Sequence, residues 1–72
     1  MNNSNKAKIQ LNGDLYQING QTNLNQLLNK LKIEKNKVAI EVNGEIVQKG
    51  KYQNLILSKD DKVEIVHFIG GG

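Results

Sequence analysis

A single stretch of this chain carries the periodicity of an α-helix, and this restricts what the remaining residues can form. Its leucines recur at positions i, i+3, i+4 and i+7, on one stripe of a helix: Leu24, Leu27, Leu28 and Leu31. Thr22 precedes them, and we expect its hydroxyl to cap the first turn. In so small a protein we interpret the stripe as core rather than as a docking face for a partner helix. One helix covers one face of a sheet, so we expect the other face to stay open.

The other apolar residues mostly alternate with polar ones, which is the period of strands with one buried face. This pattern predicts strands over residues 6–11, 15–18, 38–42 and 45–47. Asn12-Gly13 and Asn43-Gly44 stand between consecutive strands, and Asn-Gly steps suit the positive φ values of tight hairpin turns. Two hairpins are therefore expected, one on each side of the helix. Residues 49–54 are irregular, with a helical turn expected around Tyr52.

The last apolar run, residues 63–68, differs from the other strands because both of its faces are apolar. Val63 and Ile65 lie on one face, and Val66 and Phe68 lie on the other. Because the helix must cover the face with Ile65, we expect Val66 and Phe68 to form an uncovered apolar patch. The alternative is that Phe68 folds over the sheet edge and shields itself, and the pattern does not separate the two.

The length of the chain and its lack of cysteine limit its organisation. A domain typically starts at about 50 residues, so 72 residues form one domain at most. Without cysteine the chain has neither a disulfide nor a thiolate metal site, and it cannot supply a reactive sulfur of its own. We expect a disordered leader over residues 1–5, a domain over 6–69 and a flexible tail over 70–72. No apolar stretch has the character of an export signal or membrane span, so we expect a cytoplasmic protein without a membrane partner.

The positive charge of the chain does not indicate nucleic-acid binding. The net charge is +3, but all ten basic residues are lysines, and they are scattered from Lys6 to Lys62. No arginine is present to form bidentate contacts with phosphates or guanines. The three aromatic residues do not interleave with a basic cluster as a stacking platform requires. We interpret the lysines as a solvated surface.

Several apparent motifs fail on spacing or composition. A phosphate loop has four residues between its glycines, whereas five separate Gly44 from Gly50, and Tyr52 replaces the required Ser or Thr. Asp60-Asp61 has no third acidic residue or histidine at ligand spacing, so we expect a solvated turn and no metal site. His67 has no cysteine or serine partner, and we interpret it as a strand residue near the rim of the core. The sequence therefore predicts no catalytic residues and no enzyme activity of its own.

The sequence closes on Gly70-Gly71-Gly72, directly after the last predicted strand. Glycine has no side chain and adopts φ of either sign, so three in a row form a slim tether that can enter a narrow channel. A terminal carboxylate has a pKa of roughly 3.5, so it is ionised at neutral pH and can attack an activated phosphate. The alternative is that these glycines are a frayed end, as most termini are.

Two segments carry a specific family resemblance: VAIEVNGEIV at residues 38–47 and VEIVHFIGGG at residues 63–72. Together with Gly20-Gln21-Thr22 ahead of Leu27-Leu28, they make the chain similar to the ThiS family of sulfur carriers. The similarity extends over nearly everything after Lys6.

The predicted order of elements is that of the ubiquitin-like β-grasp fold, to which this family belongs. We therefore expect an α+β protein with a mixed sheet of four to five strands and one helix packed across one face. Two departures from the family pattern lie outside the tail. Gln48-Lys49 stands where Pro-Arg is usual, and Lys59-Asp60-Asp61 stands where many relatives have Gly-Asp.

The resemblance implies a protein substrate rather than an enzyme. In that family a ThiF-like adenylating enzyme binds MgATP, and the carrier itself binds no cofactor. The resemblance makes Gly72 the residue that is adenylated and then converted to a thiocarboxylate, with sulfur supplied by a cysteine desulfurase. Gly70 and Gly71 would thread into the partner sites, and Val66, Phe68 and Ile69 would bind the partners. A ThiG-like thiazole synthase would receive the sulfur for the thiazole ring of thiamin.

Two other functions fit the same pattern. One is the small subunit of molybdopterin synthase, with the same fold and thiocarboxylate but a different sulfur acceptor. The other is a ubiquitin-like modifier or binding module that is joined to lysines or only binds its partner.

Overall fold

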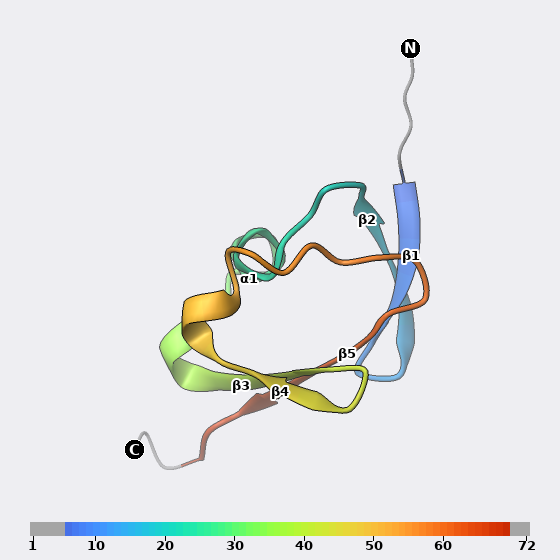
Figure 1. Ribbon diagram of the computed structural model, residues 1–72. Helices are drawn as coiled ribbons and strands as arrows, with labels where there is room; N and C mark the ends of the chain where they lie inside the picture. The colour runs from blue at the N-terminus through green and yellow to red at the C-terminus, as the bar shows by residue number, and fades with distance from the viewer. Residues whose placement is uncertain (1–5, 70–72) are drawn as a thin grey trace.

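The computed structural model describes residues 6–69 and contains all five predicted strands and the predicted helix (Figure 1). The elements in chain order are β1 (Lys6–Leu11), β2 (Asp14–Asn19), α1 (Leu24–Leu31), β3 (Val38–Val42), β4 (Glu45–Val47) and β5 (Lys62–His67), with 3₁₀ turns η1 (Lys35–Lys37) and η2 (Lys49–Lys51). The predicted leader and the predicted glycine tail lie outside the described residues. Within residues 6–69, no helix combines the length and apolar character needed to cross a membrane.

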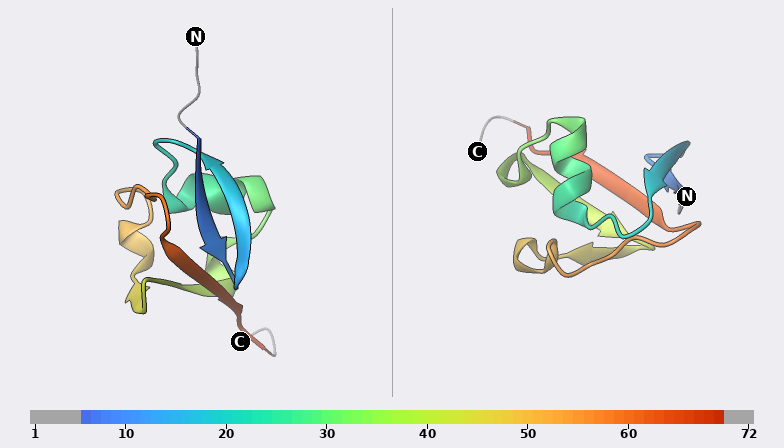
Figure 2. Two further views of the ribbon diagram at one scale, coloured as in Figure 1. Left: turned by 90° about the vertical axis from the view of Figure 1, so that its right-hand side faces the viewer. Right: turned by 90° about the horizontal axis from the view of Figure 1, so that it is seen from above.

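The strands form one mixed sheet in the order β2-β1-β5-β3-β4, with β5 at its centre. Strands β1 and β5 run parallel, and the other neighbouring pairs are antiparallel. Helix α1 lies across one face of this sheet (Figure 2). The prediction of an α+β protein with one helix on a mixed sheet is confirmed, and the sheet has five strands.

Both hairpins turn at the predicted Asn-Gly steps. The φ values are 50° and 88° at Asn12 and Gly13, and 54° and 86° at Asn43 and Gly44. Two successive positive φ values are typical of the type I′ turn, whose twist matches that of the flanking strands. These two-residue loops place Leu11 opposite Asp14 and Val42 opposite Glu45.

Helix α1 begins one residue later than the sequence suggests. Asn23 is the N-cap, with its side chain accepting from the Gln26 backbone N–H at 2.8 Å while the Gln26 side chain accepts from the Asn23 N–H at 2.9 Å. The prediction of Thr22 as N-cap is wrong, and its hydroxyl instead donates to the Asn19 carbonyl. A cap at Thr22 would place Asn25 three residues on, whereas a cap at Asn23 places the longer Gln26 there and completes a reciprocal capping box.

Helix α1 ends at a residue in the left-handed backbone conformation. Lys32 has φ 60°, and its backbone N–H donates to the Asn29 carbonyl, while the Ile33 N–H reaches the Leu28 carbonyl. These bonds satisfy carbonyls that the helix leaves without partners. Ile33 then packs against the core.

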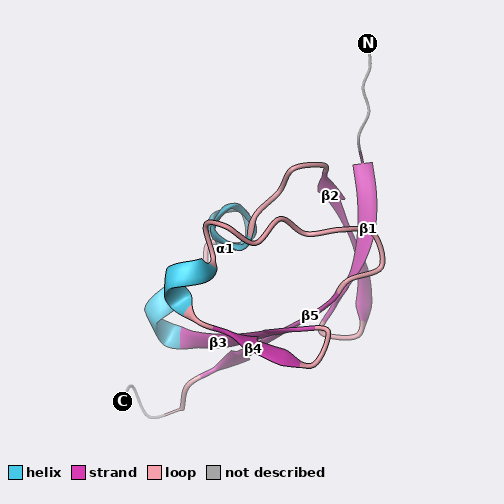
Figure 3. Cartoon of the chain, in the orientation of Figure 1, coloured by secondary structure: helices cyan, strands magenta, loops and turns pink. Residues whose placement is uncertain are grey.

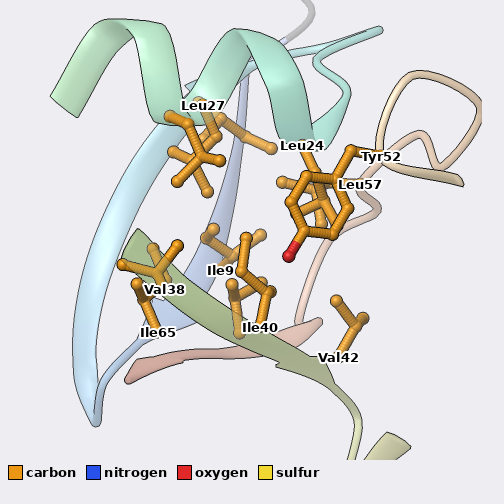
Figure 4. Close-up of a cluster of buried hydrophobic side chains, with 12 residues drawn as sticks. Ile9, Leu24, Leu27, Val38, Ile40, Val42, Tyr52, Leu57 and Ile65 are labelled. Carbon is orange, nitrogen blue, oxygen red and sulfur yellow. The ribbon is translucent and has the colours of Figure 1, made fainter. Parts of the chain in front are cut away.

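The core lies between α1 and one face of the sheet (Figure 4). Its fully buried members come from the helix, from three strands and from the segment after β4: Ile9, Leu24, Leu27, Val38, Ile40, Tyr52 and Val63. The predicted assignment of the helix to the face with Ile65 is confirmed, since Ile65 is also buried there.

Tyr52 follows η2, where a helical turn was predicted, but its complete burial was not predicted. Figure 3 shows the long connection between β4 and β5 passing the start of α1. This connection is tied to the helix because the Tyr52 carbonyl accepts from the Leu24 N–H at 3.2 Å and the Leu57 N–H donates to the Thr22 carbonyl at 2.8 Å. Burial raises the pKa of the Tyr52 hydroxyl.

Candidate functional site

The face of the sheet opposite α1, which we call the open face, carries the predicted apolar pair. Successive residues of a strand point to opposite faces, so the neighbours of the buried Ile65 point away from the core. Val66 is 58% exposed and Phe68 is 52% exposed. The prediction that these two side chains are uncovered is confirmed, and complete self-shielding of Phe68 does not occur. Ile69, the last described residue, is 96% exposed.

Strand pairing adds a residue to this surface that the sequence analysis missed. Ile46 on β4 lies opposite Glu41 of β3, which in turn lies opposite Glu64 of β5. Ile46 therefore points to the open face, and it is 72% exposed. The exposure of Ile46 on this face could have been predicted from the Asn43-Gly44 turn, because a two-residue loop sets which residues of the two strands face each other. We call Ile46, Val66 and Phe68 the apolar patch.

Phe68 is held beside the sheet although it lies one residue beyond β5. Its backbone N–H donates to the Lys37 carbonyl at 2.9 Å, which extends the β5–β3 pairing. The ammonium Nζ of Lys49 lies 5.5 Å from the centroid of the Phe68 ring and 3.4 Å from the Val38 carbonyl oxygen. A cation over an aromatic face is attractive. Lys49 therefore orients the Phe68 ring, a role that the sequence analysis did not assign to it.

Asn12 ends the contact between β1 and β5. The two strands pair only at Gln10 with Lys62 and at Leu11 with Val63. Beyond them, the Asn12 side chain accepts from the Ile65 N–H at 2.7 Å and donates from Nδ2 to the Ile65 carbonyl at 3.3 Å. The Asn12 side chain thus makes the two hydrogen bonds to Ile65 that the backbone of a neighbouring strand would otherwise make.

As a result, the last part of β5 extends past β1 while β3 still pairs with it up to His67. This part of the strand leads directly toward the C-terminal residues (Figure 1). His67 is exposed on it. Gly70, Gly71 and Gly72, to which the sequence analysis assigned threading and modification, lie outside the described residues.

The acidic and histidine side chains of the described residues do not gather into a cluster. Within residues 6–69, no three His, Asp or Glu side chains converge on a point at which a metal ion could bind. The Asp61 carboxylate is occupied by local structure, accepting from the Ser58 N–H at 2.7 Å and from the Asn43 side chain at 3.0 Å. The open face carries exposed apolar side chains on and beside the end of β5.

Comparisons with known proteins agree with this arrangement. The sequence matches the ThiS family over residues 9–72. The sulfur carrier protein ThiS of Bacillus subtilis is 38% identical over 65 residues, which are 89% of this chain and 98% of that protein. The crystal structure of the thiamine biosynthesis protein ThiS of Geobacter metallireducens superposes with a TM-score of 0.77 at 29% identity, covering 90% of this chain and 99% of that one.

Longer proteins also contain a similar segment. The thiazole synthase of Magnetococcus marinus is 45% identical over 65 residues, which are 90% of this chain but 20% of that protein. The thiazole synthase of Paramagnetospirillum magneticum is 40% identical over the same length, again 20% of that protein. The chain thus spans about a fifth of the length of these relatives.

Proposed function

Because the chain belongs to the ThiS family, we propose that it is a sulfur carrier for the thiazole ring of thiamine and that its reacting group is the carboxylate of Gly72. The carrier is a substrate of its partner enzymes and not itself an enzyme. The observation that carries the proposal is the exposure of Val66 and Phe68 at the end of the central strand, shortly before the glycines.

The chemistry begins with a carboxylate that is a poor acceptor of nucleophiles. On a ThiF-like activating enzyme, the Gly72 carboxylate attacks the α-phosphorus of MgATP, pyrophosphate leaves, and an acyl-adenylate forms. The terminal sulfur of a persulfide from a cysteine desulfurase then attacks the carbonyl carbon and displaces AMP. Cleavage of the sulfur–sulfur bond by a thiol leaves the thiocarboxylate. A glycine at this position keeps the attacked carbon unhindered.

The contribution of this chain is to deliver the carboxylate. Ordering three backbone residues in an enzyme channel costs on the order of 3–6 kcal/mol. Burying a large apolar side chain contributes about 1.5–3 kcal/mol. Val66 and Phe68, each roughly half exposed, and the nearly fully exposed Ile69 can therefore offset much of the ordering cost when they bind a partner. Gly70 and Gly71, which lack side chains, would then extend into the partner site.

We further propose that a ThiG-like thiazole synthase receives the sulfur. This is supported by the thiazole synthases that contain a segment similar to this chain, because a carrier joined to its acceptor enzyme is held at a high effective concentration. Since the proposed reaction uses ATP and a cysteine-derived persulfide, we propose that the carrier acts in the cytoplasm.

The test is sulfur loading in vitro. The chain ending at Gly72 is incubated with the activating enzyme, MgATP, a cysteine desulfurase and cysteine, and its intact mass is measured. We expect the mass increase for replacement of one oxygen by sulfur, and none when ATP is omitted. An unchanged mass in the complete mixture would overturn the proposal. Deletion of the gene in its host should be rescued by thiamine, whereas recovery that requires molybdopterin would assign the carrier to that cofactor.

A further inference from the structure

An asparagine that is followed by glycine has a side-chain amide open to attack by the backbone, because glycine has no side chain to hinder its own nitrogen. The chain contains three such steps, and a large aliphatic residue precedes each of them: Leu11-Asn12-Gly13, Ile18-Asn19-Gly20 and Val42-Asn43-Gly44. The local sequences are therefore closely matched. A difference in reactivity among the three has to come from the fold.

Two of the three side-chain amides are held by hydrogen bonds on both of their polar atoms. Oδ1 of Asn12 accepts from the Ile65 N–H at 2.7 Å, and its Nδ2 donates to the Ile65 carbonyl at 3.3 Å. Oδ1 of Asn43 accepts from the Lys62 N–H at 2.9 Å, and its Nδ2 donates to the Asp61 carboxylate at 3.0 Å. These bonds direct each amide toward β5 or the turn before it, so both bonds must break before the glycine nitrogen can reach the amide carbon.

The amide of Asn19 is not held in this way. Asn19 is the last residue of the edge strand β2, where it pairs with Lys6. Within residues 6–69, no hydrogen bond holds its side chain, and the one made beyond the strand pairing uses its backbone carbonyl. All three asparagines are exposed, so hydrogen bonding and not access of water separates them. The Asn19 side chain can therefore turn toward the Gly20 nitrogen.

The Thr22 hydroxyl adds a second feature to this site. It donates to the Asn19 carbonyl, which belongs to the same peptide group as the Gly20 N–H. When that N–H loses its proton, the negative charge is shared with the carbonyl oxygen, and a donor already in place stabilises it. The Gly20 nitrogen is thereby favoured as a nucleophile at the step where the neighbouring amide is free to turn.

We propose that Asn19 is a site of spontaneous deamidation in the folded protein and that Asn12 and Asn43 are protected from it. The Gly20 nitrogen loses its proton to hydroxide and attacks Cγ of Asn19. The new N–C bond forms, the Cγ–Nδ2 bond breaks, and Nδ2 takes up a proton and leaves as ammonia. Water then opens the succinimide at either carbonyl, which gives aspartate or isoaspartate without any oxidation or reduction. The product has one more negative charge, and isoaspartate lengthens the backbone at the end of β2.

The test is incubation of the unaltered chain in mildly alkaline buffer, followed by lysine-specific digestion and tandem mass spectrometry. We expect Asn19 to convert about tenfold or more faster than Asn12 or Asn43, because two hydrogen bonds protect each of these. In urea that unfolds the chain, the three rates should become similar. Conversion of Asn12 or Asn43 in the folded protein at the rate of Asn19 would overturn the proposal, and so would a difference that persists in urea.

Two substitutions test the causes separately. Thr22→Val removes the hydroxyl and keeps the shape of the side chain, so it should slow conversion at Asn19 alone. Asp61→Ala removes the acceptor for Nδ2 of Asn43, so it should speed conversion at Asn43 alone. Asn12 is the internal reference in both variants. Rates at Asn19 and Asn43 that match those of the unaltered chain would overturn the role given to these hydrogen bonds.

Discussion

Two individual side chains hold the end of β5 and the residue after it in position. Asn12 forms hydrogen bonds with both the backbone N–H and the carbonyl of Ile65, and Lys49 lies over the Phe68 ring. Neither residue is in the core, yet Asn12 binds β5 and Lys49 contacts the residue that follows it. The consequence is that the end of β5 is held on its β3 side and by these two side chains, while Val66 and Phe68 stay accessible.

Phe68→Ala should weaken partner binding more than it weakens the fold. Because about half of the side chain is already exposed, we expect a loss of roughly 1 kcal/mol or less in the free energy of unfolding. The fully buried Ile40 provides the comparison, since Ile40→Ala should cost about 2–5 kcal/mol. Urea unfolding and calorimetry with the activating enzyme measure the two effects. A large loss of stability with unchanged binding would place Phe68 in the core instead.

Gly72→Val, or one extra residue after Gly72, should block sulfur loading without altering the fold. A branched side chain crowds the carbonyl carbon, and an added residue moves the carboxylate away from the site of adenylation. Intact mass after incubation with ATP, activating enzyme and sulfur donor measures loading, and circular dichroism checks the fold. Gain of sulfur by either variant would contradict the assignment of Gly72.

Helix α1 and the two hairpins depend on local features of the sequence, a helix cap and two tight turns. Helix α1 has only eight residues, so it owes its place to the buried leucine stripe and to the capping box at its start. The two Asn-Gly turns hold the register of the hairpins, and the register in turn decides which side chains reach the open face.

The capping box can be tested by a pair of adjacent substitutions. Asn23→Ala should cost about 1 kcal/mol of unfolding free energy, because it removes the acceptor for the Gln26 N–H. Thr22→Ala should cost less, since the Thr22 hydroxyl does not bond to an amide of the helix. Denaturant unfolding of both variants measures the difference. The reverse order would restore Thr22 as the N-cap.

The protein has a small core between α1 and the sheet, and the β4–β5 connection covers one side of this core. Tyr52 contributes the largest fully buried side chain, from a segment without regular strand or helix periodicity. The Tyr52 side chain lies near Leu57 in the buried cluster (Figure 4), so its removal would leave a cavity there. On the other face of the sheet no described segment covers Ile46, Val66 or Phe68, and their side chains stay exposed.

Burial of Tyr52 predicts a loss of stability in alkali. Its pKa is raised in the folded protein above the ordinary value of 10.0, so folding favours the neutral phenol. The stability from this group is fully present below pH 10.0 and is lost as pH rises through the raised pKa. Tyr52→Phe keeps the ring and should show a smaller decline above that pH. Urea unfolding across the alkaline range measures both proteins, and identical pH dependence would contradict the prediction.

The sequence by itself determined the local elements and the family. The leucine stripe, the alternating strands and both Asn-Gly turns depend on residues that are close in the chain, and so they were predicted. The exposure of Val66 and Phe68 was also predictable, because one helix covers only one face of a sheet. The N-cap was misplaced by one residue because Thr22 and Asn23 both have suitable side chains.

Only the tertiary structure decided which distant residues meet. Asn12 and Ile65 are 53 positions apart, and their bond depends on where β1 stops beside β5. The facing of Glu41 and Glu64 depends on the register of β3 with β5, which no turn connects. Tyr52 is buried because the β4–β5 connection packs against the start of α1. Such contacts depend on strand order and packing across the whole molecule, and a local pattern of residues does not specify them.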